Sequence, residues 1–292
     1  SAFSRATATT HPHPFLLFVV LTHIITFMST SSRPLSKRMT ATLRGLHSRH
    51  NRQRSSLSIL VGIRAVEAAV QGGAAIGHVV GTNEVLHTER FQQLQDALTD
   101  VPHYTAESDT LNDLAPVATA QGLLATVRIP ALDADALLSE ATTILLLDGV
   151  QDPGNVGTLI RTAAWFGIDA VVAGPETAGL YHPSVLRAGM GGHWDVALGR
   201  HDNLPAYISK ARSGGMTCYG ADMGGTPAQY WHPVQPSLLV VGSEAHGLSP
   251  ALMAEIDEPV SVTGGGAHPA TESLNAAVAA GIVMHRWTVA AP

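Results

Sequence analysis

Several residue types are scarce in this sequence, and each scarcity narrows what the chain can be. Its 292 residues include one cysteine, Cys218, which excludes an internal disulfide framework and an all-cysteine zinc site. Aromatic residues make up 5% of the chain, whereas 45% of the residues are hydrophobic and 28 are glycine. This balance favours tightly packed α/β layers over an aromatic-rich β-sandwich, and the length is sufficient for two modest domains.

Acidic residues are missing from the beginning of the chain, where Glu67 is the first. The same stretch is rich in cations, which include Arg33, Lys37, Arg38, Arg44, Arg49, Arg52, Arg54 and Arg64. Because the net charge is −6, the rest of the chain is strongly acidic. Residues 1–54 are therefore interpreted as a basic arm for a polyanion or as a targeting leader, and we expect them to be poorly ordered.

The longest apolar run, residues 14–28, is shorter than the roughly 20 residues that a membrane-spanning helix needs. It fits a signal-peptide core, part of an organelle transit peptide, or translated upstream sequence with Met28 or Met39 as the true start. We expect a cytoplasmic protein with no membrane partner, or an imported one if residues 1–50 are a genuine presequence.

Two patterned regions follow the leader. Residues 55–130 alternate short apolar runs with helical spacing and predict a small α/β domain, joined by a linker to a domain at 142–292. In the second domain, apolar runs at 144–147, 170–173, 216–219, 238–241 and 260–262 alternate with helical patterns. Strands buried on both faces read as continuous apolar runs, so this region predicts a parallel sheet covered by helices.

Three segments of the second domain carry polar residues where strands give way to helices. In the first, a Gly/Pro/Asn-rich turn leads into a helix at 158–166, and Arg161 falls about 130° from the middle of that helix's apolar face. Arg161 therefore points to solvent, to a site or to a partner. In the second, an apolar strand runs into Gly242, Glu244 and Gly247, and Glu244 taken alone could equally cap a helix. In the third, Ser273 and Asn275 open a helix of small residues.

Together these segments resemble the three signature motifs of the SpoU-type RNA ribose methyltransferases of the SPOUT superfamily. The matching strings are DPGNVGTLIRTAAWFG, VVGSEAHGLS and ESLNAAVAAGI, within residues 142–287. Residues 57–128 are more weakly similar to the ribosomal-protein-like substrate domain that often precedes the catalytic domain. The resemblance implies an α/β fold whose C-terminal parallel sheet contains a deep trefoil knot.

The resemblance also implies S-adenosylmethionine-dependent methylation of a ribose 2′-hydroxyl in structured RNA, either rRNA or tRNA, by a homodimer without a metal. The motif polar positions correspond to catalytic residues Arg161, Asn155, Glu244, Ser273 and Asn275, with Arg161 central. The positions that correspond to cofactor contacts are Gly242, Val262, Leu274 and Ala221. We hypothesise that the other polar residues orient Arg161, which stabilises the developing oxyanion.

One stretch departs from the family pattern. Val262, Thr263 and Gly264 stand where the family commonly has Ile-Pro-Met, and a Gly-rich stretch follows up to residue 271. The alternatives are a catalytically inactive SPOUT-like RNA-binding assembly factor, a SPOUT enzyme acting on a base nitrogen or a non-RNA target, and a nucleotide-binding oxidoreductase. The last lacks the GxGxxG fingerprint, and the 15 histidines form no HExxH or Cys/His metal pattern.

Overall fold

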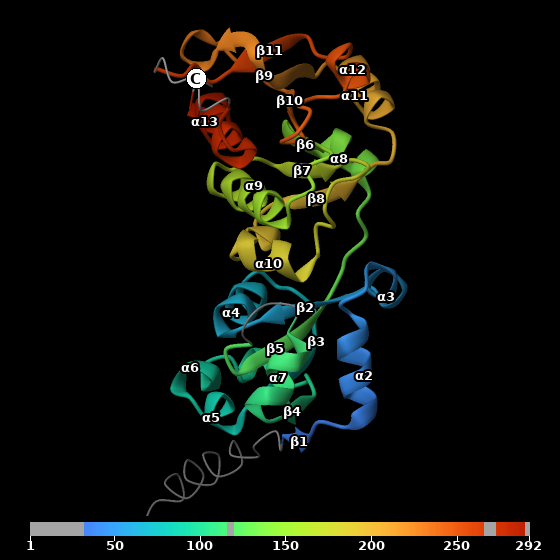
Figure 1. Ribbon diagram of the computed structural model, residues 1–292, viewed down its shortest axis with the longest axis vertical. Helices are drawn as coiled ribbons and strands as arrows, with labels where there is room; N and C mark the ends of the chain where they lie inside the picture. Colours follow the sequence, from blue (N-terminus) through green and yellow to red (C-terminus); the bar gives the residue numbers. More distant parts are fainter. Residues whose placement is uncertain (1–31, 116–119, 266–272, 290–292) are drawn as a thin grey trace, which may run out of the picture.

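The computed structural model describes residues 32–115, 120–265 and 273–289, which build two sheets stacked along the long axis of the molecule (Figure 1). The smaller sheet comes from the first half of the chain and the larger sheet from the second half. No helix in the described ranges is both long and apolar enough to cross a membrane.

The smaller sheet has five strands in the order β1-β4-β3-β5-β2. Strand β5 pairs antiparallel with β2 and β3, whereas β4 is parallel to β3 and to β1. The strands are β1 (Arg33–Pro34), β2 (Leu57–Val61), β3 (Ile76–Gly81), β4 (His103–Thr105) and β5 (Leu123–Arg128). The helices around them are α4 (Ile63–Gln71), α5 (Asn83–Leu86), α6 (Glu89–Gln92) and α7 (Ser108–Leu114). Thr88 caps α6 by accepting from Phe91 N.

The basic segment at the beginning of this domain is ordered from residue 33. The expectation of a poorly ordered arm is therefore wrong for residues 33–54. The segment forms β1, α2 (Lys37–Gly45) and α3 (Arg49–Ser55). Leu43 and Leu46 are 1% and 2% exposed and pack in a core cluster with residues of β2, α7 and β5. Burying these two leucines stabilises α2 despite its density of positive charge. Residues 14–28 lie outside the described residues.

The larger sheet is entirely parallel, which confirms the α/β prediction for the second domain. Its order is β11-β9-β10-β6-β7-β8. The strands are β6 (Thr143–Asp148), β7 (Ala170–Ala173), β8 (Ala197–Arg200), β9 (Thr217–Pro227), β10 (Ser237–Gly242) and β11 (Glu258–Ser261). The helices are α8 (Ala134–Glu140), α9 (Pro153–Trp165), α10 (Pro183–Gly189), α11 (Leu204–Ser213), α12 (Pro250–Met253) and α13 (Ala276–Val289). Strands β6 and β10 pair directly, so their carboxyl ends at Asp148 and Gly242 are neighbours.

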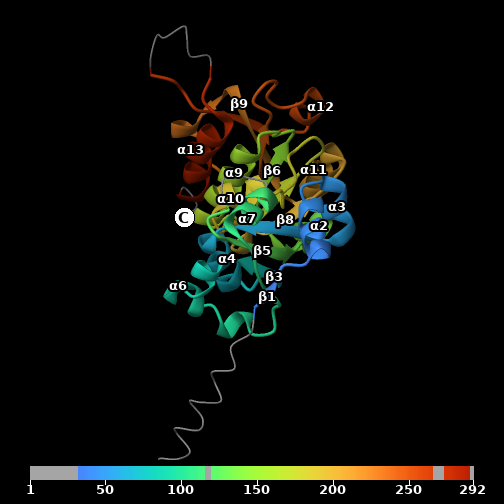
Figure 2. The ribbon, with the colours of Figure 1, turned by 60° about the horizontal axis from the view of Figure 1, so that its bottom comes forward.

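Small residues let the helices of this domain approach closely. A Cβ built on Gly157 of α9 would lie 2.6 Å from the carbonyl oxygen of Val185 in α10, so only glycine permits this helix contact. Helix α13 packs beside α9, with the rings of Phe166 and His285 5.6 Å apart, edge to face. Figures 1 and 2 show α9 and α13 on one side of the molecule and α2 and α3 on the other.

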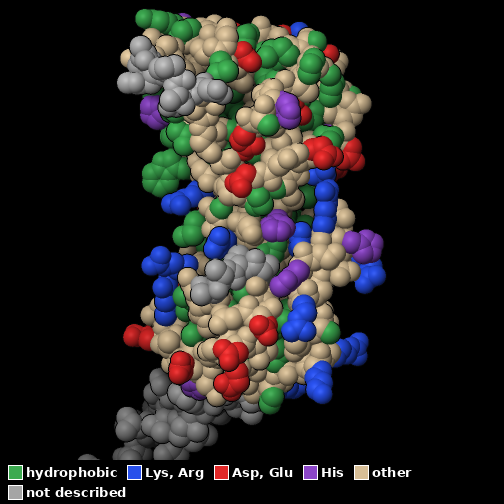
Figure 3. Space-filling model, in the orientation of Figure 1, with side chains coloured by type: hydrophobic (Ala, Val, Ile, Leu, Met, Phe, Trp, Pro, Cys, Tyr) green, Lys and Arg blue, Asp and Glu red, His purple; other side chains and the backbone are tan. Residues whose placement is uncertain are grey.

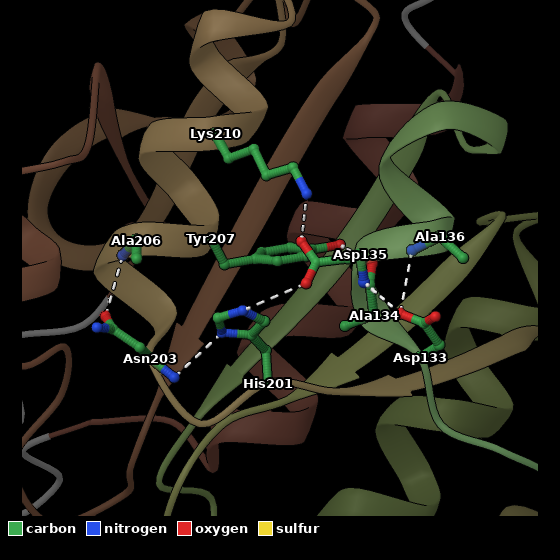
Figure 4. Close-up of polar contacts among 9 residues, drawn as sticks. All are labelled: Asp133, Ala134, Asp135, Ala136, His201, Asn203, Ala206, Tyr207 and Lys210. Atoms are coloured by element: carbon green, nitrogen blue, oxygen red, sulfur yellow. Dashed lines mark hydrogen bonds and ion pairs between the residues drawn. The ribbon is translucent and has the colours of Figure 1, made fainter.

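Helix α8 connects the two domains and is fixed to the larger sheet by polar contacts (Figure 4). Lys210 Nζ of α11 lies 2.6 Å from Asp135 Oδ1, and His201 approaches the other oxygen of this carboxylate. The buried Tyr207 hydroxyl donates to the carbonyl of Ala134, and Asp133 caps α8. The linker therefore leaves the smaller domain and reaches the edge of the larger sheet in a defined position.

The junction of the two domains is packed and continuous. Ser58 Oγ of β2 donates a buried hydrogen bond of 2.6 Å to the carbonyl of Tyr181. Trp194 lies so close to Gly72 that a Cβ there would clash with it. One hydrophobic cluster includes residues of both domains, such as Val66 of α4 and Val185 of α10. This shared packing favours a fixed orientation of the two domains over an independent hinge.

Asp169, before β7, connects the starts of two strands and should make stability depend on pH. Desolvation opposes ionisation of its carboxylate, but four hydrogen bonds from the backbone and hydroxyl groups of Thr142 and Thr143 outweigh it and lower its pKa. A lowered folded-state pKa contributes stability above the unfolded pKa, about 3.9, and loses it as the pH falls through the folded pKa. We expect Asp169→Asn to cost about 1 kcal/mol at pH 7, or about 2–4 °C in Tm, and the difference to shrink below about pH 4. Thermal unfolding across pH measures this, and a pH-independent difference would contradict it.

Candidate active site

The first motif forms the turn from β6 into α9. Asp148 ends the strand, and its carboxylate accepts a hydrogen bond of 3.0 Å from Ser249 N. Asp152 caps α9 by accepting from Asn155 N at 2.8 Å, and Pro153 occupies the first position of the helix, where its missing N–H costs nothing. These contacts fix the start of α9 and hence the direction of the Asn155 side chain.

The second motif forms a tight loop after β10. Ser243 and Gly247 exchange two backbone hydrogen bonds, of 3.1 and 2.9 Å, so residues 243–247 close on themselves. Gly247 adopts a φ of +65°, which favours glycine. Within this loop Glu244 and His246 are exposed. The closed loop therefore projects Glu244 away from its own strand and toward the start of α9.

Three predicted polar residues, one from each motif, meet in a single hydrogen-bonded group. Asn155 Nδ2 donates to Glu244 Oε1 at 2.6 Å, and Asn275 Nδ2 donates to Asn155 Oδ1 at 3.0 Å. Asn275 Oδ1 accepts from the backbone N–H groups of Ala277 and Val278, which caps α13. We call Glu244, Asn155 and Asn275 the motif triad. It connects the start of α9, the loop after β10 and the start of α13.

Arg161 lies outside the motif triad. It is exposed on α9, as its helical position predicts, and six residues separate it from Asn155. At about 100° per residue the two side chains leave the helix about 120° apart. No hydrogen bond joins Arg161 to the triad in the described part of the chain. Within one chain, no direct contact therefore supports the hypothesis that these residues orient Arg161. Ser273 is exposed two residues before Asn275, and its side chain makes no hydrogen bond among the described residues.

Three of the four positions matched to cofactor contacts lie in or just after adjacent strands, two of them at carboxyl ends. Gly242 ends β10, Val262 follows β11, and Ala221 lies in β9 between them in the sheet. Ala221 and Val262 are partly buried against the main core, whereas Leu274 is 48% exposed. A ligand in an open parallel sheet binds at this end of the strands. The stretch that departs from the family pattern is described only up to Gly265.

Comparisons with known proteins agree with this geometry. Residues 142–285 match the model of the SpoU rRNA methylase family, and residues 41–125 match the MRM3-like substrate binding domain. The chain is 32% identical to the 23S rRNA (guanosine(2553)-2′-O)-methyltransferase RlmP of Bacillus subtilis, over 82% of this chain and 92% of that protein. The chain belongs to the SpoU rRNA methylase family. The motif triad and Arg161 all lie within the matched SpoU domain.

Solved structures resemble the chain over nearly its full described length. A protein from Porphyromonas gingivalis, assigned to the TrmH family of RNA methyltransferases, is 32% identical with a TM-score of 0.72, covering 87% of this chain and 98% of that one. The SpoU methyltransferase AviRb of Streptomyces viridochromogenes, solved with S-adenosylmethionine, has a TM-score of 0.74 at 24% identity and the same 87% coverage of this chain, 97% of its own. The second likeness supports the fold of the SpoU domain.

Sequence reasoning missed several residues that build the site. Asp148 and Asp152 hold the loops of the first two motifs through backbone N–H groups, and an aspartate just before a helix is a recognisable capping signal. Exposed apolar side chains were missed too: Trp165 of α9 is 84% exposed, and Val278 and Ile282 of α13 are 53% and 44% exposed. Asp152 therefore has a sequence signal, whereas Asp148 and the exposed apolar side chains are recognised only from the structure.

Asn155→Ala should loosen the loop after β10, because it removes both side-chain hydrogen bonds of the motif triad. Both bonds are solvent-accessible, so we expect a loss of only about 1 kcal/mol in the free energy of unfolding, with a several-fold loss of S-adenosylmethionine affinity. Thermal unfolding with and without the cofactor measures both. A double-mutant cycle with Asn275→Ala tests the network, and additive effects would show that the two side chains are not coupled.

Proposed function

We propose that this SpoU-family chain methylates the ribose 2′-hydroxyl of a ribosomal RNA, with S-adenosylmethionine as methyl donor. The observation that carries the proposal is the motif triad, in which three segments far apart in the sequence meet at the carboxyl ends of the strands. The family match and the likeness to a ribosomal RNA 2′-O-methyltransferase support the substrate class. Transfer RNA is the alternative substrate within the same chemistry.

The residues present fit the cofactor. Gly242 approaches the loop so closely that a Cβ would lie 2.2 Å from the carbonyl carbon of Gly247, which leaves backbone rather than side chain at the strand end. Val262, just after β11, packs partly against the core, and Leu274 exposes an apolar side chain just before α13. Backbone groups flanked by apolar side chains suit an adenosine, whose ring has a flat apolar face and a polar edge. When bound there, S-adenosylmethionine supplies a methyl group activated by its sulfonium charge.

The remaining chemistry belongs to the chain's own residues. The 2′-hydroxyl is a poor nucleophile because its proton is tightly held, so its oxygen must be aligned and the negative charge that develops on it must be stabilised. We assign the second task to Arg161, whose guanidinium donates hydrogen bonds but is too basic to accept the proton. Glu244, Asn155 and Asn275 position the loops around the reacting groups, and Ser273 lies two residues before Asn275.

Arg161 lies next to a surface that fits a second copy of the chain. Trp165 follows it by one helical turn, and the exposed Val278 and Ile282 lie on the neighbouring helix α13. Figure 3 shows hydrophobic side chains along this edge of the SpoU domain. We therefore propose a two-fold homodimer through α9 and α13, which brings Arg161 to the interface, where it can contact groups of the second copy.

Trp165→Glu should dissociate this homodimer. The indole is nearly fully exposed in one chain, and a central aromatic side chain typically contributes about 2 kcal/mol or more to an interface, or roughly a 30-fold change in Kd. Sedimentation at several concentrations measures the shift toward monomer. Val234→Glu is the control because Val234 is 54% exposed in the loop before β10, outside α9 and α13. Equal behaviour of the two variants would remove α9 from the interface.

The course of the chain after β11 supports a further family feature, the trefoil knot. Strand β11 lies at one edge of the sheet, whereas α13 packs against α9 and against β10, which is an interior strand. Helix α13 therefore does not lie beside the strand that precedes it in the chain. We propose that the chain is knotted here, as the resemblance implies.

Transfer of a labelled methyl group from S-adenosylmethionine to total ribosomal RNA tests the function directly. Mass spectrometry of the digested RNA should locate the methyl group on one ribose. Methylation of a base would contradict the ribose assignment. RNA binding without any transfer would instead favour the inactive assembly factor.

A further inference from the structure

A cavity of about 240 Å³ lies at the junction of the two domains. It is lined in part by α3, which lies on the side opposite α9 and α13 (Figure 1). Its walls come from α3 and the turn after it, from the linker after β5, from the loop before α10 and from the end of β8. The shared hydrophobic packing holds these walls in place. The cavity is separate from the motif triad and from the candidate cofactor contacts.

The charged side chains that line this cavity are positive. Arg49, Arg52 and Arg200 line it together with His182, and no carboxylate does so in the described part of the chain. Arg200 Nε lies 3.7 Å from Asp202, whose side chain is 91% exposed and therefore screened by solvent. Three guanidinium groups around one cavity favour an anion.

Arg52 shows that the positive charge is built into the fold. Its residue is 6% exposed, and Nη1 donates hydrogen bonds of 2.8 Å to the carbonyl oxygens of Leu46 and His47. Burial, and then repulsion from Arg49, lower the pKa of Arg52, as expected for a cation without a carboxylate partner. A buried, fixed guanidinium has already lost its side-chain freedom and binds an oxyanion at little further entropic cost.

The rest of the lining is apolar. Ile129, Leu132 and Leu180 contribute wall surface, which suits the flat apolar face of a nucleotide base. The cavity also adjoins α2 and α3, which contain no acidic residue and expose Lys37, Arg38 and Arg54. Figure 3 shows Lys and Arg side chains along this side of the molecule.

We propose that the junction cavity binds one nucleotide of the substrate RNA, with its phosphate at Arg49, Arg52 and Arg200. The inference rests on the proposed function, because it takes the RNA as the source of the nucleotide. A free mononucleotide shares the same chemistry. The bound nucleotide anchors RNA at the domain junction, remote from the methylated ribose.

Gly179→Leu tests the cavity without changing any charge. Gly179 lines it, and a Cβ added there meets nothing within 4 Å, so the leucine can enter the cavity while the backbone stays unstrained. Binding of a fluorescein-labelled ribosomal RNA stem–loop should weaken about tenfold, the loss expected when a charge-assisted hydrogen bond is removed. Ser139→Leu adds the same side chain at an exposed position on α8 and should bind normally.

A matched pair of arginines on α3 tests the phosphate. Arg49→Gln and Arg54→Gln remove the same charge from exposed positions of one helix, but only Arg49 lines the cavity. With Arg49→Gln, the slope of log K against log salt should fall by about one, and with Arg54→Gln by clearly less. Uridine 5′-monophosphate should compete for the cavity better than inorganic phosphate or uridine, and Gly179→Leu should abolish that competition.

Unchanged RNA affinity in Gly179→Leu, or equal salt slopes in the two arginine variants, would overturn the proposal. If uridine 5′-monophosphate binds tightly but Gly179→Leu leaves the affinity for RNA unchanged, the cavity binds a free nucleotide. That outcome would overturn the RNA assignment. These outcomes are separate from the proposed function, since wild-type methyl transfer to RNA is measured independently. Absence of that transfer would refute the function while leaving the binding result intact.

Discussion

Arg161→Ala is expected to slow methyl transfer about 10²–10³-fold while S-adenosylmethionine binds as it does to the wild type. Removing one donor that stabilises a developing oxyanion has an effect of this size in other enzymes. Arg161 is exposed on α9 and separate from the candidate cofactor contacts, so its loss should leave the fold and cofactor affinity unchanged. Single-turnover transfer to RNA and calorimetric titration with the cofactor measure the two effects.

Arg161→Lys is the informative companion to this variant. Lysine keeps the charge but loses the forked pair of donors, so partial recovery would indicate that charge matters more than geometry. Arg187→Ala is the control, because Arg187 is an exposed arginine in the last turn of α10, outside the motifs. Near-normal turnover of Arg161→Ala with intact cofactor binding would remove Arg161 from the chemistry.

Much of the fold could be predicted because buried parallel strands leave a clear pattern. Strands β6, β7 and β10 are continuous apolar runs, and the structure places them side by side in the sheet. Strand β8 has no such run and was missed. Its Gly199 allows α8 to pack so closely that a Cβ would lie 2.9 Å from Ala134 Cα. Tertiary packing against α8, rather than local hydrophobicity, thus accounts for a glycine in this strand.

The contacts within the candidate site could not be predicted from the sequence. Family motifs identified Asn155, Glu244 and Asn275, but the hydrogen bonds between them span 89 and 120 residues of sequence. Such contacts follow from the register of β6 with β10 and from the return of α13, which no local pattern encodes. The basic segment shows the converse error: its composition suggested disorder, whereas two buried leucines were enough to dock α2.

Gly242→Ala is expected to lower methyl transfer about 100-fold by displacing the loop after β10. An added Cβ would lie 2.2 Å from both the carbonyl carbon and oxygen of Gly247 and 2.5 Å from Leu248 N. All three are backbone atoms, so no side chain can rotate away, and the two hydrogen bonds between Ser243 and Gly247 must break or shift. A displacement of about 1 Å at a reacting centre can cost about 10²-fold in rate. The overpacking itself should cost about 1–3 kcal/mol of unfolding free energy.

The two effects of Gly242→Ala can be separated by measuring cofactor affinity and thermal unfolding on the same protein. Gly179→Ala is the matched control, because it makes the same substitution where a Cβ meets nothing within 4 Å. Cofactor affinity should fall sharply only in Gly242→Ala, since its loop also carries Glu244 to the start of α9. If Gly242→Ala is destabilised but binds S-adenosylmethionine normally, Gly242 serves the packing of the loop alone and the cofactor lies elsewhere.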